Sequence, residues 1–333
     1  MTFARTLVSA AALLLSAGAV WAEDANPAVI FDLGGKFDRS FNQASFEGAE
    51  RFKEETGIGY REFELQSDAQ REQALRRFAQ QGYDPVVVAG FSNASAMETV
   101  AAEFPDTRFV LIDAVVDLPN VRSVVFSEHE GSYLVGMLAA MASKTGKVGF
   151  VGGMDIPLIR KFACGYVQGV KAVNPDAEVF QNMTGSTGAA WNDPVRGGEL
   201  AKSQIDRGAD VIYHAAGGTG IGVLQAAADA GVLGIGVDSN QDYLHPGNML
   251  TSMLKRVDNA VYDAMMDVQN GDWSTGVEVM GLAQDGVGYS VDEFNEALIT
   301  EEMLTTTDQA RTEIISGEIE VHDYMSDDSC PAS

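Results

Sequence analysis

Acidic side chains follow three apolar runs of the sequence at the points where each run ends. These residues are Asp32, Asp113 and Asp238. An ionised carboxylate can accept two hydroxyl hydrogen bonds, which suits the cis-diol of a sugar. Lys255 ends another run, 249–254, and its ammonium is expected beside Asp238, either as a structural ion pair or as a ligand contact. These residue types predict a site for a small polar ligand with hydroxyl groups.

The segment from Phe31 to Asn42, FDLGGKFDRSFN, holds the densest set of groups that could contact such a ligand. Its glycine pair lets the backbone approach a ligand closely. Ser40 is expected to cap the helix that follows, whose first N–H groups would then point at the ligand, and Asn42 adds an amide. A plain strand-to-helix turn is the alternative. It accounts for Lys36 and Arg39 and leaves Asp38 open between solvation and ligand contact.

Two aromatic residues stand at the starts of helices in opposite halves of the chain. Phe41 begins one helix, and Trp191 precedes another whose expected cap is Asp193 and whose first residue is Pro194. Two rings in these places could sandwich a flat ligand, with each stack contributing about 1–3 kcal/mol. A hydrophobic staple on each helix explains the same positions equally well.

The sequence predicts no catalytic residue, no metal site and no cofactor. None of the four histidines is paired at metal-ligand spacing, and no GxSxG elbow or Ser–His–Asp order occurs. The stretch from Gly218 to Gly222 is short of a full dinucleotide-binding fingerprint. The remaining enzymatic alternative is hydrolysis of a nucleoside by two cleft aspartates, which would release free base.

Strands and helices alternate along the chain, and the strands are almost wholly apolar. This pattern predicts an α/β fold with parallel sheets that are covered on both faces. The arrangement from Asp68 to Asp113 recurs about 125 residues later, from Asp193 to Asp238, with the glycines Gly90 and Gly217 at equivalent strand ends. We therefore expect two similar doubly wound lobes.

Ligands of open parallel sheets bind beyond the carboxyl ends of the strands, where the three aspartates and Gly217 are predicted to lie. Two lobes facing each other would complete one site by hinge closure. We expect a first lobe from residues 26–126 and 253–276 and a second from residues 127–252 and 277–333. The three hinge strands should cross near Phe126-Ser127, Ser252-Met253 and Thr275-Gly276.

The N-terminus reads as a secretory signal peptide, residues 1–22, with an apolar run too short for a comfortable membrane span. Cleavage after Ala22 would give a periplasmic protein, and the lack of a cysteine there predicts that it is not a lipoprotein. The net charge of -26 excludes nucleic acid polymers as partners and suits a monomer. Cys164 and Cys330 are expected to form a disulfide in an oxidising compartment, with two independent thiols as the alternative.

Together these motifs resemble the basic membrane protein (BMP) family of ABC-transporter substrate-binding proteins, typified by purine nucleoside receptors. The resemblance runs from about Ala28 to Tyr324. The motifs that carry it are the segment 31–42, Ile112-Asp-Ala114, Glu130-Gly-Ser-Tyr-Leu-Val-Gly136, Trp191-Asn-Asp-Pro194, Gly217-Gly-Thr-Gly220, Gly236-Val-Asp238 and Thr251-Ser-Met-Leu-Lys255.

The resemblance implies a type I periplasmic-binding fold that captures a nucleoside and delivers it to an inner-membrane ABC permease. It implies that Phe41 and Trp191 sandwich the base and that Asn42 and Asp113 bind its edge. The ribose contacts it implies come from Asp32, Asp238, Lys255 and the backbone at Gly217. The longer loop before Trp191 departs from the family pattern and leaves the base undetermined. Rival functions on the same fold are sugar binding and receptor-coupled sensing.

Overall fold

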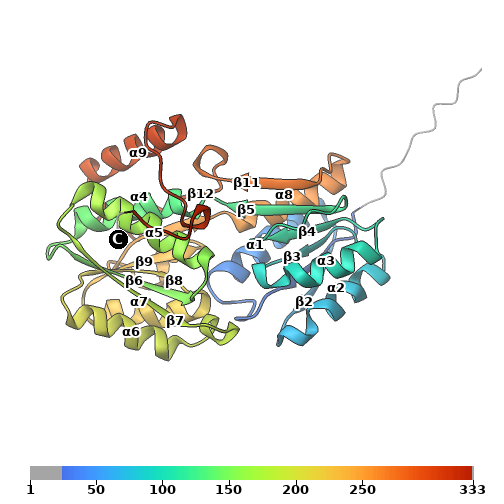
Figure 1. Ribbon diagram of the computed structural model, residues 1–333, viewed down its shortest axis with the longest axis horizontal. Coiled ribbons are helices and arrows are strands. Elements are labelled where there is room, and N and C mark those ends of the chain that lie inside the picture. The colour runs from blue at the N-terminus through green and yellow to red at the C-terminus, as the bar shows by residue number, and fades with distance from the viewer. Residues whose placement is uncertain (1–24, 332–333) are drawn as a thin grey trace, which may run out of the picture.

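The computed structural model describes residues 25–331, which form two lobes, each built on a six-stranded sheet (Figure 1). The first sheet has the order β11-β5-β4-β3-β1-β2, and all its neighbouring strands are parallel. Its strands are β1 (Ala28–Phe31), β2 (Arg61–Glu64), β3 (Val86–Val88), β4 (Phe109–Ile112), β5 (Val121–Phe126) and β11 (Gly276–Met280). The helices of this lobe are α1 (Phe41–Thr56), α2 (Arg71–Gln80), α3 (Ala94–Glu103) and α8 (Val257–Asn270).

The second sheet repeats this plan with the order β12-β10-β9-β8-β6-β7. Only the pairing of β12 with β10 is antiparallel. Its strands are β6 (Lys147–Met154), β7 (Glu178–Gly185), β8 (Val211–Ala215), β9 (Leu233–Asp238), β10 (Met249–Lys255) and β12 (Val287–Tyr289). The helices of this lobe are α4 (Glu128–Ala142), α5 (Pro157–Val173), α6 (Pro194–Asp206), α7 (Gly220–Asp229) and α9 (Glu301–Ser316). The predicted fold of two doubly wound lobes is confirmed.

The sequences of the elements explain this layering. The strand β3 consists of three valines with no exposed surface, as expected for a parallel strand covered on both faces. The helix α1 ends at Gly57, whose φ of 74° is the left-handed conformation that glycine adopts without strain. Asp193 caps α6 by accepting a hydrogen bond from the Arg196 backbone N–H at 2.9 Å, as predicted.

Three segments carry the chain between the sheets. The strand β10 stays in the second sheet as far as Lys255, and β11 lies in the first sheet from Gly276 to Met280. The second and third crossings therefore fall after these strands rather than at Ser252-Met253 and Thr275-Gly276. We propose that the lobes hinge near Ser127, Arg256 and Gly281. Backbone hydrogen bonds tie the crossings together, because Ser127 donates to Met280 at 3.1 Å and Arg256 to Gly286 at 2.8 Å.

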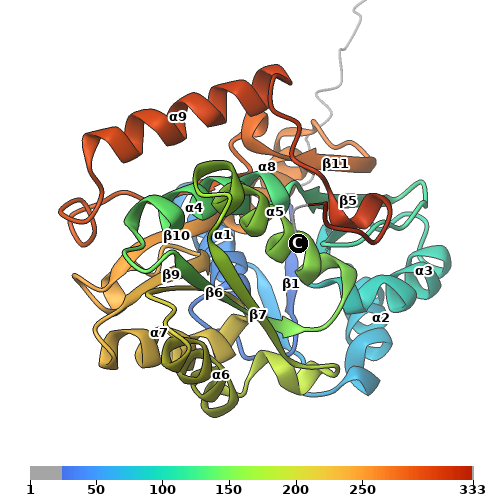
Figure 2. The same ribbon diagram turned by 60° about the vertical axis from the view of Figure 1, so that its left-hand side comes forward.

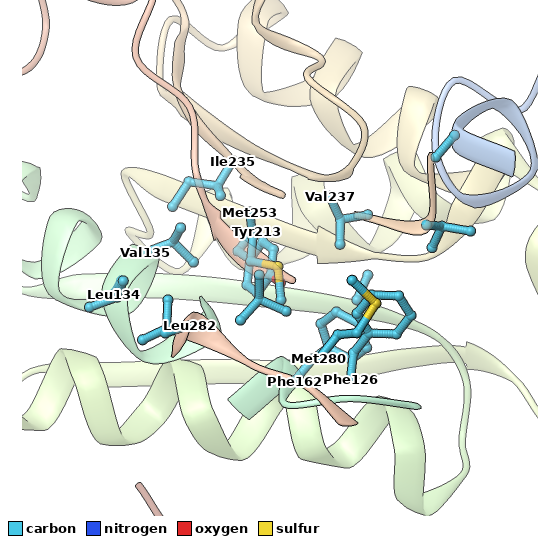
Figure 3. Packing of buried hydrophobic residues seen from close by; sticks show 14 of the residues in the cluster. Phe126, Leu134, Val135, Phe162, Tyr213, Ile235, Val237, Met253, Met280 and Leu282 are labelled. Atoms are coloured by element: carbon cyan, nitrogen blue, oxygen red, sulfur yellow. The ribbon is translucent and has the colours of Figure 1, made fainter. Parts of the chain in front are cut away.

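Apolar side chains fill the region where the crossings meet. Phe126, Phe162 and Met280 pack together there, and further side chains such as Met253 and Tyr213 continue the core into the second lobe (Figure 3). None of these five residues is more than 5 % exposed. The core is therefore continuous from one lobe to the other through the crossings.

The C-terminal segment lies against α5, as both views of the ribbon show (Figure 2). A disulfide joins Cys164 of α5 to Cys330. Gln168 exchanges two hydrogen bonds with the backbone of His322, at 3.0 and 2.9 Å. Within residues 25–331, no helix has the length and apolar character needed to cross a membrane. The predicted signal peptide lies outside the described residues.

Candidate functional site

A cavity lies between the two lobes, at the carboxyl ends of their strands. All eight residues that the sequence predicted for ligand binding line it: Asp32, Phe41, Asn42, Asp113, Trp191, Gly217, Asp238 and Lys255. Further lining residues had not been predicted to contact a ligand, namely Leu33, Phe91, Leu158, Ile159, Phe162, Ala215, Ala216 and Val237. Both lobes therefore contribute to one shared crevice.

The turn before α1 differs from its prediction in how the helix is capped. Ser40 makes no capping hydrogen bond with its side chain. Asp38 does this instead, because its carboxylate accepts hydrogen bonds from the backbone N–H groups of Ser40, Asn42 and Gln43 at 2.8–3.1 Å. Asp38 is a buried cavity residue rather than a solvated charge, and burial raises its pKa to about 6.

The side chain of Asn42 bridges the backbone of the turn from Asp32 to Gly35. Its side-chain oxygen accepts from the Asp32 backbone at 2.9 Å, and its side-chain nitrogen donates to the carbonyls of Asp32 and Gly35 at 3.1 and 3.3 Å. The amide that was predicted to contact a ligand is therefore engaged by the protein backbone. Asn42 lines the cavity mainly as the clamp that shapes this turn.

Asp32 lines the cavity from the end of β1, and it pairs with Arg71, which does not line the cavity. Arg71 of α2 donates to one carboxylate oxygen, Oδ1, at 2.6 Å, and also to Asn93 at 3.0 Å. Burial raises the pKa of Asp32, and Arg71 opposes that shift. A Cβ atom on Gly90 would lie only 2.0 Å from Oδ2 of Asp32, so only glycine leaves room for the second carboxylate oxygen. Sequence patterns could not reveal Arg71 as the partner, because it lies 39 residues away.

Lys255 pairs with a different carboxylate from the one predicted. Its Nζ lies 2.7 Å from Oδ2 of Asp113 and 3.0 Å from Oε1 of Glu128. Burial alone would lower the pKa of Lys255, but these carboxylates and Asp238 raise it instead. Sequence reasoning missed Glu128, which is 1 % exposed and begins α4.

Asp113 and Asp238 occupy equivalent places at the ends of β4 and β9. Both adopt left-handed backbone conformations, with φ of 74° and 64°, which are uncommon outside glycine. Burial raises the pKa of each to about 6, and Lys255 opposes the shift in both cases. The repeat seen in the sequence therefore places two similar carboxylates at one crevice, one from each lobe.

Direct hydrogen bonds join the lobes beside the cavity. The Ser40 hydroxyl donates to the Asp238 carboxylate, and the Ser239 hydroxyl donates to the Ser40 carbonyl at 2.8 Å. The side-chain amide of Gln241 donates to the Arg39 carbonyl at 2.9 Å. Gln241 is itself held by the ring of His214 at 2.9 Å. These bonds hold the two lobes against each other beside the cavity.

The two predicted aromatic residues both reach the cavity. The ring of Trp191 lies against Gly153, where an added Cβ atom would come within 2.2 Å of it. One part of the ring is thus covered by backbone, and the cavity borders another. Phe41 lines the cavity from the start of α1, and its ring centroid lies 5.2 Å from Nζ of Lys255. Leu158, Ile159 and Phe162 of α5 add an apolar wall.

The polar atoms left for a ligand are mainly acceptors. Within residues 25–331, Asp113 Oδ1 is buried with no hydrogen-bond partner. In the same part of the chain, Asp32 and Asp238 each accept hydrogen bonds through one oxygen only. A ligand must therefore offer hydroxyl or amino donors to three carboxylates and an apolar face to the rings.

The family model of PnrA-like ABC transporter substrate-binding proteins (Bmp) matches residues 25–324. An ABC transporter nucleoside-binding protein, BmpA of Lactococcus lactis, is 34 % identical over 322 residues, covering 90 % of this chain and 89 % of the relative. One similar solved structure is a solute-binding protein of an ABC transporter system from Aeropyrum pernix. It is 32 % identical to this chain with a TM-score of 0.82, and the match covers 89 % of this chain and 92 % of the Aeropyrum chain.

These comparisons correct the predicted localisation. A relative from Pyrococcus abyssi is 35 % identical over 278 residues, covering 79 % of this chain and 68 % of its own length, and is named an uncharacterized lipoprotein. Relatives from two further Pyrococcus species carry the same description. The expectation of a free periplasmic protein without lipid, which relied on residues 1–22, is contradicted by these names and is withdrawn.

Proposed function

This chain belongs to the PnrA-like (Bmp) family of ABC transporter substrate-binding proteins, and we propose that the solute it captures is a nucleoside. The nucleoside-binding relative from Lactococcus lactis supports this ligand class. The observation that carries the proposal is that two aromatic residues and three carboxylates line the same crevice. Each carboxylate has one oxygen that can still accept a hydrogen bond from a ligand.

A nucleoside matches both halves of this arrangement. Its flat base would lie between Phe41 and Trp191, where each stacked ring contributes about 1–3 kcal/mol. Its ribose hydroxyls would donate to Asp32 and Asp238, with the Gly217 backbone beside them. Asp113 would accept a hydrogen bond from the edge of the base through the oxygen that Lys255 leaves unused.

The charges of the cavity argue against a phosphorylated ligand. Among residues 25–331, four aspartates line it, and Lys255, the one lining cation of that range, is shared by Asp113 and Glu128. Arg71 lies behind Asp32 and is likewise engaged. A phosphate group would meet uncompensated negative charge and would have to be desolvated, which is strongly unfavourable. The proposed ligand is therefore a nucleoside and not a nucleotide.

Capture would proceed by closure of the lobes about their three crossings. The closed form is stabilised by the bonds of Ser239 and Gln241 to the Ser40 turn, which an open form would lose. We propose that this monomer delivers its ligand to an ABC permease and performs no catalysis. Sensing through a receptor would use the same closure, and dependence of uptake on the permease distinguishes the two.

Isothermal titration calorimetry of the purified protein tests the ligand class. The panel contains purine and pyrimidine nucleosides, ribose, glucose and nucleoside 5′-monophosphates. We expect a nucleoside to bind at least about 100-fold more tightly than the free sugars and the monophosphates, because only the nucleoside fills both parts of the crevice. Binding of sugars alone would overturn the nucleoside assignment. Free base found by chromatography after incubation would point to a hydrolase.

A further inference from the structure

A row of buried charges leads from the ligand cavity into the second lobe. Lys255 Nζ lies 2.7 Å from Asp113 and 3.0 Å from Oε1 of Glu128. The other oxygen of Glu128, Oε2, lies 3.1 Å from Nζ of Lys161. Lys161 also donates to the Phe126 carbonyl at 2.7 Å and lies 3.4 Å from Asp323. Asp113 and Lys255 line the cavity, whereas Glu128 and Lys161 lie behind them.

These charges come from the segments that cross between the lobes. Glu128 is the first residue of α4, directly after the first crossing, and Lys255 is the last residue of β10, directly before the second. Lys161 comes from α5, the helix that also supplies the apolar wall of the cavity. The Glu128–Lys255 pair therefore fixes two crossings to each other at the floor of the site.

The surroundings of Lys255 leave its ammonium few alternative positions. Three aromatic ring centroids lie 5.0–5.5 Å from Nζ, belonging to Phe41, Phe126 and Phe162. The lysine side chain is 2 % exposed, so its ammonium depends mainly on protein groups for compensation. Without the charge of Glu128, the ammonium of Lys255 would donate hydrogen bonds to both oxygens of Asp113. One of these, Oδ1, has no hydrogen-bond partner within residues 25–331.

We infer that Glu128 is a positioning residue of the ligand site, which draws the ammonium of Lys255 to one side so that Asp113 keeps one oxygen for the ligand. Lys161 holds Glu128 in that place. The inference rests on the proposed function in so far as the cavity binds a solute. Burial alone would raise the pKa of Glu128, but Lys255 and Lys161 keep it below its usual value, so Glu128 is ionised at neutral pH.

A purely structural role for Glu128 makes a different prediction. As an acidic residue in the first turn of α4, Glu128 also favours that helix, and it neutralises two buried lysines. Removing it would then lower stability, and ligand affinity would recover as soon as stability is restored. A positioning role predicts that affinity stays low even when stability recovers.

The test compares four forms of the protein by calorimetry and by urea unfolding: wild type, Glu128→Gln, the double variant Glu128→Gln with Lys161→Met, and Asp267→Asn. The double variant also removes Lys161, which the single change leaves with only Asp323 and the Phe126 carbonyl as partners. Asp267 pairs with the buried Arg122 at 2.7 Å outside the cavity and is itself 35 % exposed, so its variant controls for the loss of a carboxylate that neutralises a buried cation. The probe is the tightest-binding member of the nucleoside and sugar panel described above.

We expect both Glu128 variants to bind the probe at least about tenfold more weakly than wild type. This factor corresponds to the loss of one hydrogen bond from the ligand to the charged Asp113. The double variant should regain much of the stability that the single variant loses, and Asp267→Asn should bind like wild type. Wild-type affinity in the double variant would overturn the inference. If no panel member binds the wild type, the proposed function fails and the next measurement still decides the role of Glu128.

Crystal structures of ligand-free wild type and Glu128→Gln give a readout that does not depend on the ligand. In the variant, Nζ of Lys255 should lie within hydrogen-bonding distance of both oxygens of Asp113. An unchanged distance from Nζ to Asp113 Oδ1, with the introduced amide contacting Lys255 as the carboxylate does in wild type, would overturn the inference.

Discussion

Replacing Trp191 by alanine removes one of the two rings that we propose to stack on the base. The Trp191 ring packs against Gly153 on one part of its surface, so it can offer a ligand only one stacking contact. Phe41 remains in place on the other lobe. The expected loss is therefore one stacking term of about 1–3 kcal/mol, which weakens nucleoside binding by about 5- to 150-fold.

Calorimetry at neutral pH measures this change, with Trp191→Phe and Trp273→Ala as matched variants. Trp191→Phe keeps a ring in the crevice and should lose less affinity than Trp191→Ala. Trp273 lies outside the cavity, with Arg122 4.5 Å from its ring, and its loss should leave nucleoside affinity unchanged. If Trp191→Ala bound the nucleoside as tightly as wild type, stacking on this ring would be refuted.

Three further predictions follow from the buried charges and the disulfide. Burial raises the pKa of Asp113 and Asp238 to about 6, so lowering the pH from about 7.5 to about 5 protonates both acceptors. Calorimetry should show nucleoside affinity falling by at least about tenfold, the effect of protonating one of them, and constant affinity over that range would contradict this. Arg71→Met should lower the free energy of urea unfolding by about 3 kcal/mol, whereas Arg76→Met on the exposed side of the same helix should leave it nearly unchanged. Cys330→Ser should lower the same free energy by about 2–4 kcal/mol, and an unchanged urea midpoint would show that the disulfide contributes nothing.

Strand periodicity and internal repetition were enough to predict the fold and the neighbourhood of the site. A carboxylate directly after an apolar parallel strand must emerge at the carboxyl edge of its sheet, so Asp32, Asp113 and Asp238 could be placed without coordinates. The same logic placed Gly217 after β8. These positions depend only on local sequence and on the direction of parallel strands.

The partners of these residues could not be predicted, because they depend on contacts between distant parts of the chain. Lys255 pairs with Asp113 across 142 positions, and Ser40 reaches Asp238 across 198. Nothing in the local sequence around Glu128, the first residue of α4, indicates a buried position between two lysines. The second and third crossings were predicted a few residues too early, because the sequence does not mark where the chain leaves one sheet for the other.

The crystal structure of the protein with the nucleoside that binds most tightly tests the central claim most directly. The account predicts that the base lies between Phe41 and Trp191 in a closed crevice, with ribose hydroxyls donating to the carboxylates of Asp32 and Asp238. A nucleoside bound elsewhere, or a sugar-sized ligand that leaves both rings uncontacted, would contradict it.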